Sequence, residues 1–218
     1  MKEQSGKIIE FAKENRPVAG CTISKQIYYK DGTGIAIFSL ASGTSISAES
    51  YEYHKLWTVY EGEIELFTTD GRSRIATTGE SILTPLHVSV GVKAKKDSIY
   101  TEVEFRKEGT MNEILKAGEV FQLAELLPYQ EGKIVNMDLV SNDKMKFVIM
   151  SFDAGTGLPE HAAPGEALVF ALDGEAVIGY EGKEYTIHAG ETFKFDKLGK
   201  HSVSATKQFK MALLLVLE

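Results

Sequence analysis

Residues 155–201 read GTGLPEHAAPGEALVFALDGEAVIGYEGKEYTIHAGETFKFDKLGKH, and this stretch decides the fold class. Polar and glycine-containing blocks around His161 and His201 flank an apolar run and a glycine-rich turn. The run Ala167–Leu172 is apolar on both faces, which is typical of a strand that is packed on both sides inside a barrel. The stretch therefore predicts short strands in an all-β fold.

A weaker copy of this layout lies earlier, at residues 43–91. Gly62 and Gly174 lie 112 residues apart, and with this offset the segment IAIFSLASGT at 35–44 aligns with FVIMSFDAGT at 147–156. Beyond the central hairpin the offset becomes 111, which pairs Gly79 with Gly190. Because glycines, turns and apolar positions stay in phase over most of the chain, we expect two copies of one β module.

The repeat predicts two domains, residues 1–109 and 110–218, with the boundary in the charged segment 106–117. Each copy consists of short apolar runs separated by turn residues, which is typical of an antiparallel β domain. Helix signals are few, and the candidates are Lys7–Glu14 and Met111–Leu115.

Composition excludes several classes of function. The net charge is −7 with scattered basic residues, whereas nucleic-acid binding needs a basic face. No apolar run approaches the length of a membrane span, and the N-terminus lacks the apolar core of a signal peptide. The single cysteine, Cys21, is expected to be a small buried residue. We expect a cytoplasmic protein that binds neither nucleic acid nor membranes.

The positions of Gly155, His161, Gly174, Gly190 and His201 resemble the motifs of the cupin superfamily. The first of these motifs runs roughly G-x5-H-x-H-x3,4-E-x6-G, and the second runs G-x5-P-x-G-x2-H-x3-N. The resemblance covers nearly the whole chain and implies a bicupin, which has two tandem jelly-roll barrels and few short helices. In the family, the histidines and the glutamate of these motifs hold a divalent metal inside the barrel.

The second copy departs from this ligand set. Ala163 stands at the place of the second histidine, and Ala167 at that of the glutamate, with Glu166 one position early. The resemblance therefore implies at most one divalent metal (Fe, Mn, Ni or Zn), held in the C-terminal barrel by His161, Glu166 and His201. Neighbouring strand residues point to opposite faces, so Glu166 can join the histidines only if residues 163–166 leave the strand register.

Two alternatives to this metal site stay open. In one, His161 and His201 are pocket residues hydrogen-bonded to each other, to Glu160 or to water. In the other, Glu160 or Asp196 supplies the carboxylate. His188, beside a Gly-Glu turn, is expected to lie at the surface.

The first copy keeps none of the matched ligands, since Glu49 and Val90 stand where His161 and His201 do. We expect a polar, aromatic pocket here, suited to a small polar organic ligand. Its predicted lining residues are Glu49, Tyr51, Tyr53, His54, Trp57 and His87. The alternative is a barrel filled by its own side chains.

The expected function is that of a bicupin that binds a small polar metabolite in the C-terminal barrel, with an incomplete metal site. The alternative is a metal-dependent cupin enzyme, of dioxygenase or isomerase type, that uses only this barrel. No pairing of nucleophile and base stands out, so the sequence leaves open whether a reaction is catalysed. A third role is structural, since the apolar segments Ile8–Phe11 and Val120–Leu127 are candidates for strand exchange in a homodimer.

Overall fold

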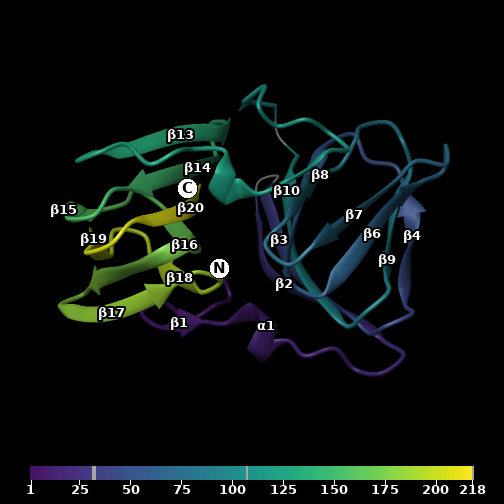
Figure 1. Cartoon of the computed structure of the whole chain (residues 1–218), viewed down its shortest axis with the longest axis horizontal. Helices are drawn as coiled ribbons and strands as arrows, with labels where there is room; N and C mark the ends of the chain where they lie inside the picture. Colours follow the sequence, from purple (N-terminus) through teal and green to yellow (C-terminus); the bar gives the residue numbers. More distant parts are fainter. Residues whose placement is uncertain (31–32, 107, 218) are drawn as a thin grey trace. The chain divides into compact units, whose positions relative to one another are not determined.

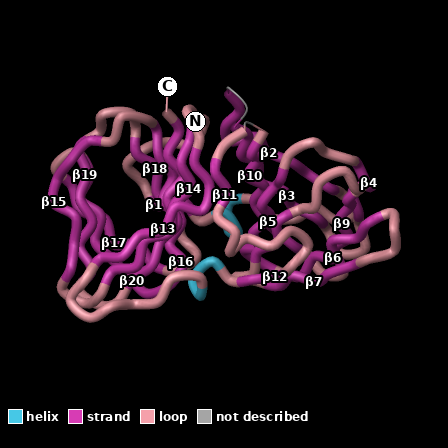
Figure 2. Tube along the Cα trace, turned by 90° about the horizontal axis from the view of Figure 1, so that it is seen from above, coloured by secondary structure: helices cyan, strands magenta, loops and turns pink. Residues whose placement is uncertain are grey.

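The computed structural model describes residues 1–30, 33–106 and 108–217, and nearly all of its regular structure is strand (Figure 2). Helical structure in this part of the chain is limited to α1 (Phe11–Glu14) and a 3-10 turn, η1 (Leu123–Glu125). The predicted all-β class is therefore confirmed. The first expected helix shortens to α1 because Ile8–Ile9 forms a strand, and the second is wrong because Thr110–Met111 is a strand and residues 112–115 are not helical.

The described chain divides into two compact units, each assembled from three segments. Unit 1 comprises Met1–Lys2, Phe11–Glu108 and Leu115–Gln122. Unit 2 comprises Glu3–Glu10, Gly109–Ile114 and Leu123–Glu218. Each unit therefore includes a short segment from the other half of the sequence.

Unit 1 contains two antiparallel sheets, with strand orders β12-β8-β5-β10-β3-β2 and β4-β9-β6-β7 (Figure 1). The strands of the first sheet are β12 (Val120–Phe121), β8 (Ser81–Leu83), β5 (His54–Glu61), β10 (Ser98–Phe105), β3 (Thr33–Leu40) and β2 (Thr22–Lys30). Those of the second are β4 (Ser45–Glu49), β9 (Val90–Ala94), β6 (Glu63–Thr68) and β7 (Ser73–Thr77).

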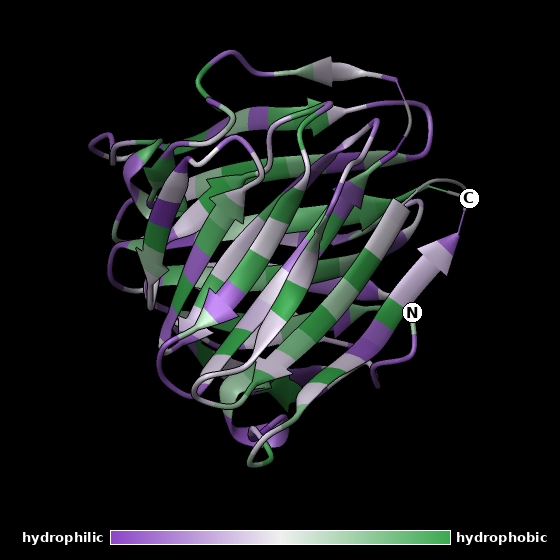
Figure 3. Ribbon diagram, turned by 90° about the vertical axis from the view of Figure 1, so that its right-hand side faces the viewer, coloured by the Kyte–Doolittle hydropathy of each residue, from purple (hydrophilic) through white to green (hydrophobic). Residues whose placement is uncertain are grey.

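The core of unit 1 lies between these sheets. Trp57 and Tyr100 from the six-stranded sheet and Ile64, Leu66 and Val92 from the four-stranded sheet belong to one buried cluster. Hydrophobic and hydrophilic residues alternate along many strands (Figure 3), because successive side chains of a strand point to opposite faces. Burial of the apolar face against the opposite sheet is what holds such a sandwich together.

Unit 2 repeats this arrangement. Its strands are β1 (Ile8–Ile9), β11 (Thr110–Met111), β13 (Ile134–Ser141), β14 (Met145–Phe152), β15 (Thr156–Ala162), β16 (Glu166–Tyr180), β17 (Lys183–His188), β18 (Thr192–Phe195), β19 (Lys200–Ala205) and β20 (Phe209–Val216). The long β16 pairs with β18 and β20 through its first half and with β17 and β19 through its second. Residues 167–171 are all buried, which confirms the prediction of a strand packed on both sides.

The strand registers follow the internal repeat. In unit 1, Ile46 pairs with Val92 across β4 and β9, and in unit 2, Leu158 pairs with Val203 across β15 and β19. These pairs are related by the offsets of 112 and 111 that the sequence predicts. The same relation holds for the Glu49–Val90 and His161–His201 pairs, so the two imidazoles of unit 2 occupy the place of one carboxylate and one valine in unit 1.

The N-terminal strand of each copy completes the other unit. Ile8 and Ile9 in β1 pair with Phe193 and Thr192 of β18, in unit 2 (Figure 1). In the same way, β12, 112 residues later, pairs with β8 in unit 1. The apolar segments that the sequence singled out for strand exchange thus pair within this one chain.

Gly62 and Gly174 occupy equivalent bends, and both have positive φ, at 90° and 72°. A side chain at Gly174 would collide with the carbonyl oxygen of Gln208, and one at Gly62 with that of Asp97. Both positions therefore require glycine, for backbone angle and for space.

Cys21 is exposed, not buried as expected, because it precedes the exposed start of the edge strand β2. Within the described ranges, no helix is long and apolar enough to cross a membrane.

Candidate functional site

His161 and His201 face each other across two paired strands of unit 2. His161 lies on β15 and His201 on β19, and the two residues are register partners. Their ring centroids are 4.3 Å apart, with an angle of 54° between the ring planes. The structure therefore brings the two predicted histidines together.

Hydrogen bonds to the backbone fix the tautomer of both rings. His161 Nδ1 lies 2.9 Å from the Pro159 carbonyl oxygen, and His201 Nδ1 lies 2.8 Å from that of Gly199. A carbonyl oxygen only accepts hydrogen bonds, so each Nδ1 carries a proton and donates it. In the neutral rings the lone pair is then on Nε2, which makes each Nε2 an acceptor or a metal ligand.

The environment of His201 disfavours the charged form of its ring. The residue is buried, and its imidazole stacks on Phe195 with centroids 4.0 Å apart. Burial lowers the pKa of His201, and nearby His161 lowers it further, against the bond to Gly199. His161 itself is exposed to solvent.

An apolar wall, formed by the core of unit 2 and the partly exposed residues packed against it, meets the histidine pair at Phe195. Phe195, on which His201 stacks, belongs to the buried core of unit 2. Met150, Leu213 and Leu215 pack against this core but remain partly exposed. Along β20, Leu213 and Leu215 alternate with buried residues and lie on the same face as Met211, which belongs to the core. Because Leu213 and Leu215 are partly exposed, solvent reaches side chains on this inner face.

Glu166 is not brought to the histidines. It is the first residue of β16, and its neighbour Ala167 belongs to the core cluster, so alternation directs Glu166 to the opposite face. There Glu166 Oε1 lies 2.8 Å from Lys194 Nζ, which also binds Asp196 Oδ1 at 2.7 Å. Burial works against the charge of Lys194, but the bonds to these two carboxylates raise its pKa.

The donor set of unit 2 does not fit a metal of ordinary affinity. Asp196 also accepts a hydrogen bond from Ser5 Oγ at 2.5 Å, and Glu160 is exposed. Among the residues that the structure describes, no group of three or more His, Cys, Asp or Glu side chains is placed to hold a metal ion. Stable sites for first-row metals use three or four such ligands, and the histidine pair supplies two.

The Glu166→Gln variant is expected to lose about 1–2 kcal/mol of unfolding free energy while the metal content of the purified protein is unchanged. The reason is that the substitution removes one charged partner of buried Lys194 and nothing from the imidazoles. Urea unfolding and elemental analysis measure the two effects, with exposed Glu184→Gln as the control. Metal present in the parent protein and lost in Glu166→Gln would contradict this placement.

The residues that were predicted to line a pocket in the first copy have different surroundings in the structure. Trp57 is buried in the core of unit 1, and Tyr51 donates a hydrogen bond to Glu49 Oε2 at 2.7 Å. His54 instead bonds through Nδ1 to the Thr84 carbonyl oxygen at 2.7 Å, and exposed His87 contacts Glu52 at 3.1 Å. His188 is exposed beside Glu191 and Glu175, in agreement with the expected surface position.

Sequence reasoning missed the charged residues that join Tyr51 and Trp57. Lys55 and Glu102 are buried and form an ion pair of 2.9 Å. The segment TEVEF, residues 101–105, alternates polar and apolar residues, which suggests a strand with a solvated face. The repeat carried the missing signal, because Glu102 and Glu104 are equivalent to Leu213 and Leu215, on the inner face of unit 2.

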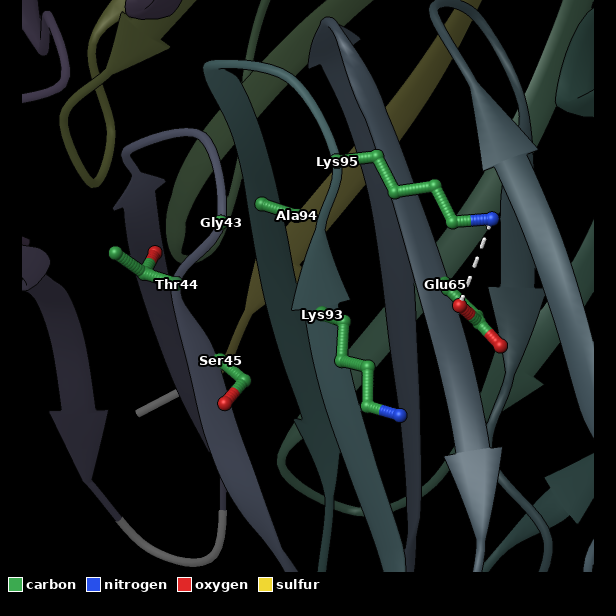
Figure 4. Close-up of a pocket in the computed structure, with 7 residues that line it drawn as sticks. All are labelled: Gly43, Thr44, Ser45, Glu65, Lys93, Ala94 and Lys95. Atoms are coloured by element: carbon green, nitrogen blue, oxygen red, sulfur yellow. Dashed lines mark ion pairs between the residues drawn. The ribbon is translucent and has the colours of Figure 1, made fainter. Parts of the chain in front are cut away.

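An open hollow of about 300 Å³ lies on the four-stranded sheet of unit 1 (Figure 4). Its lining residues are Gly43, Thr44, Ser45, Glu65, Lys93, Ala94 and Lys95. Lys95 Nζ is 3.8 Å from Glu65 Oε2, and Lys93 Nζ lies 4.5 Å from the centroid of the Phe67 ring. Both ammonium groups are thus engaged within the protein, and we place the functional site at the histidine pair.

Comparison with known proteins agrees with this architecture. A cupin domain model matches residues 148–217. The structure of a cupin 2 conserved barrel domain protein from Leptotrichia buccalis is 29% identical, with a TM-score of 0.87 over 99% of this chain and 98% of that one. No curated protein sequence matches.

More distant structures share the fold alone. A mutant of salicylate 1,2-dioxygenase from Pseudoaminobacter salicylatoxidans is 13% identical, with a TM-score of 0.61 over 84% of this chain and 70% of that one. The Ylba protein from E. coli is 12% identical, with a TM-score of 0.62 over 96% of this chain and 89% of that one.

Proposed function

We propose, for a chain that belongs to the cupin superfamily, that unit 2 binds a small polar metabolite at the histidine pair. The observation that carries the proposal is the pair of backbone bonds that holds each Nδ1–H on a carbonyl oxygen. These bonds leave two neighbouring Nε2 atoms as acceptors for hydroxyl or amine groups of a ligand.

The apolar wall supports a ligand with an apolar body and one polar end. Met150, Leu213 and Leu215 offer partly exposed hydrocarbon surface, which would be withdrawn from water on binding. Pockets for small molecules combine such a surface with a few polar groups that orient the ligand. A hydroxylated ring or short chain matches both features.

The histidine pair by itself does not fit a metal centre. Metal-ligating histidines are commonly oriented by hydrogen bonds from the other ring nitrogen, and both imidazoles have such bonds. Two imidazoles alone nevertheless fall short of the three or four ligands that a stable site needs. The metal-dependent enzyme is therefore the outcome that would overturn the proposal.

Calorimetric titration with catechol, phenol and toluene tests the proposal. We expect catechol to bind more tightly than phenol, and toluene, which lacks donors, to bind least. His161→Ala and His201→Ala should each weaken catechol binding about 5- to 10-fold, the effect of about one hydrogen bond. The surface variant His188→Ala serves as the control and should bind catechol like the parent.

Two results would contradict this function. One is equal binding of catechol by the parent and both histidine variants. The other is near-stoichiometric Fe, Mn, Ni or Zn in protein purified without chelator, with the metal lost in both variants.

Catechol binding is also expected to weaken as the pH falls through the pKa of His201 in the folded protein, which lies below the ordinary value of 6.5. Burial lowers the pKa of His201, so folding favours the neutral ring. Its contribution to stability is therefore present above the unfolded pKa and is lost as the pH falls through the lower folded pKa. Protonation also removes the Nε2 acceptor. Titrations between pH 8 and 5 measure this loss, and an unchanged affinity over that range would contradict it.

A further inference from the structure

The inner face of unit 1 holds a cluster of charged side chains that the proposed function does not use. On β5 and β10, Glu102 pairs in register with Trp57, and Glu104 pairs with Lys55. Trp57 belongs to the core between the two sheets, so alternation places Lys55, Glu102 and Glu104 on the same inner face. Only 8% of the Lys55 and Glu102 side chains and 12% of that of Glu104 are exposed.

The Lys55 ammonium group is surrounded as a bound cation would be. Its Nζ lies 2.9 Å from Glu102 Oε1 and 3.5 Å from Glu104 Oε1. It also lies 3.8 Å from the centroid of the Tyr51 ring and 6.0 Å from that of Tyr53. Carboxylates and aromatic faces at these distances are the groups that recognise organic ammonium ions.

The carboxylates and aromatic rings around Lys55 Nζ form a shell. Hydrogen bonds that do not involve the Lys55 side chain hold the carboxylates of this shell in place. Trp57 Nε1 donates to Glu102 Oε2 at 2.7 Å, and Arg106 Nε donates to Glu104 Oε2 at 2.8 Å. A side chain at Gly34 would collide with the Glu104 carboxylate, so the glycine makes room for it.

The rim of the shell consists of two partly exposed phenols. Burial is the main factor that raises the pKa of both, that of Tyr53 to about 12. The phenols therefore stay neutral, and Tyr51 can donate to Glu49. Removal of the Lys55 side chain would leave carboxylates and rings in place beside a route from solvent.

The fold itself does not require this charge. Lys55, Glu102 and Glu104 are equivalent in the repeat to Ala167, Leu213 and Leu215, and unit 2 forms the same strands with these apolar residues. Replacement of a buried ion pair by well-packed apolar residues of similar volume is also often neutral or stabilising. The charged shell is therefore an addition to unit 1 that calls for its own explanation.

We propose that unit 1 contains a binding site for a primary alkylammonium ion, which the chain occupies with its own Lys55. The side chain is a tethered ligand, and an alkylamine of similar length takes its place when it is removed. The inference is independent of the histidine pair in unit 2.

The test uses the full chain with Lys55→Ala and n-butylammonium chloride as the probe. At ten times the dissociation constant, the probe should raise the melting temperature of Lys55→Ala by about 5 °C, with saturation. Tetramethylammonium chloride, which cannot donate hydrogen bonds, should not raise the melting temperature. Sodium chloride at equal ionic strength should not raise it either. The parent should not respond, because Lys55 fills the site.

Lys93→Ala is the matched control, since Lys93 also lies over an aromatic ring of unit 1 but is exposed. If Lys55→Ala does not fold alone, refolding from urea with increasing n-butylammonium should restore folded protein along a saturation curve. The proposal is overturned if neither melting nor refolding depends on the amine, or if Lys93→Ala responds equally.

Discussion

Replacement of Glu102 by alanine is expected to lower the unfolding free energy of unit 1 by about 3–5 kcal/mol. The substitution removes the nearest carboxylate from the buried Lys55 ammonium group, 2.9 Å away, and the acceptor of the Trp57 indole. An uncompensated buried charge costs far more than the net gain from the intact pair. Urea unfolding followed by the fluorescence of Trp57, the single tryptophan, reports on this unit.

Glu63→Ala is the matched control for Glu102→Ala. Glu63 lies on β6 and contacts Lys96 at 3.3 Å, but the Lys96 side chain is 70% exposed. Removal of such a surface pair should cost about 0–1 kcal/mol. Equal losses in the two variants would mean that the Lys55 charge is solvated in the folded protein.

Ile9→Asp is expected to destabilise unit 2 by about 4–5 kcal/mol, although residue 9 lies at the opposite end of the sequence from most of that unit. Ile9 is fully buried and pairs with Thr192 of β18. An aspartate there must either be buried without a partner or detach β1 and expose the edge of β18. Hydrogen exchange of the β18 amides should therefore accelerate, while that of the β8 amides in unit 1 should not.

The equivalent substitution in the other copy reverses the pattern. Val120→Asp on β12 should accelerate exchange in β8, with which it pairs, and leave β18 protected. Exposed Val18→Asp should affect neither strand. Loss of protection in β8 after Ile9→Asp, with β18 unchanged, would contradict the pairing of β1.

Much of the fold was predictable because it depends on local patterns. Period-two alternation identifies strands, and the recurrence of Gly62 as Gly174 identifies a bend that only glycine fits. The offsets of 112 and 111 even predict which residues pair across strands, as the Glu49–Val90 and His161–His201 pairs illustrate. The candidate histidine pair was predictable for the same reason.

The residues whose orientation the sequence did not predict depend on contacts that alternation alone does not specify. Polar residues in a strand ordinarily face water, yet Glu102 and Glu104 face inward, because Lys55, Trp57 and Arg106 supply partners for them there. Glu166, next to an alanine of the core, faces outward to Lys194. A carboxylate lies where its cation and donors are, and those come from other strands.

The amino-acid sequence by itself determined a duplicated, all-β chain with cupin-like motifs and the two facing imidazoles of its second copy. These features follow from short-range periodicity and from repetition, which a linear pattern records. Only the tertiary structure decided that Ile8–Ile9 joins unit 2, that Glu166 leaves the histidines for Lys194, and that Lys55 lies within a shell of carboxylates and rings. Each of these outcomes depends on partners far away in the chain, whose proximity exists only once the strands have paired.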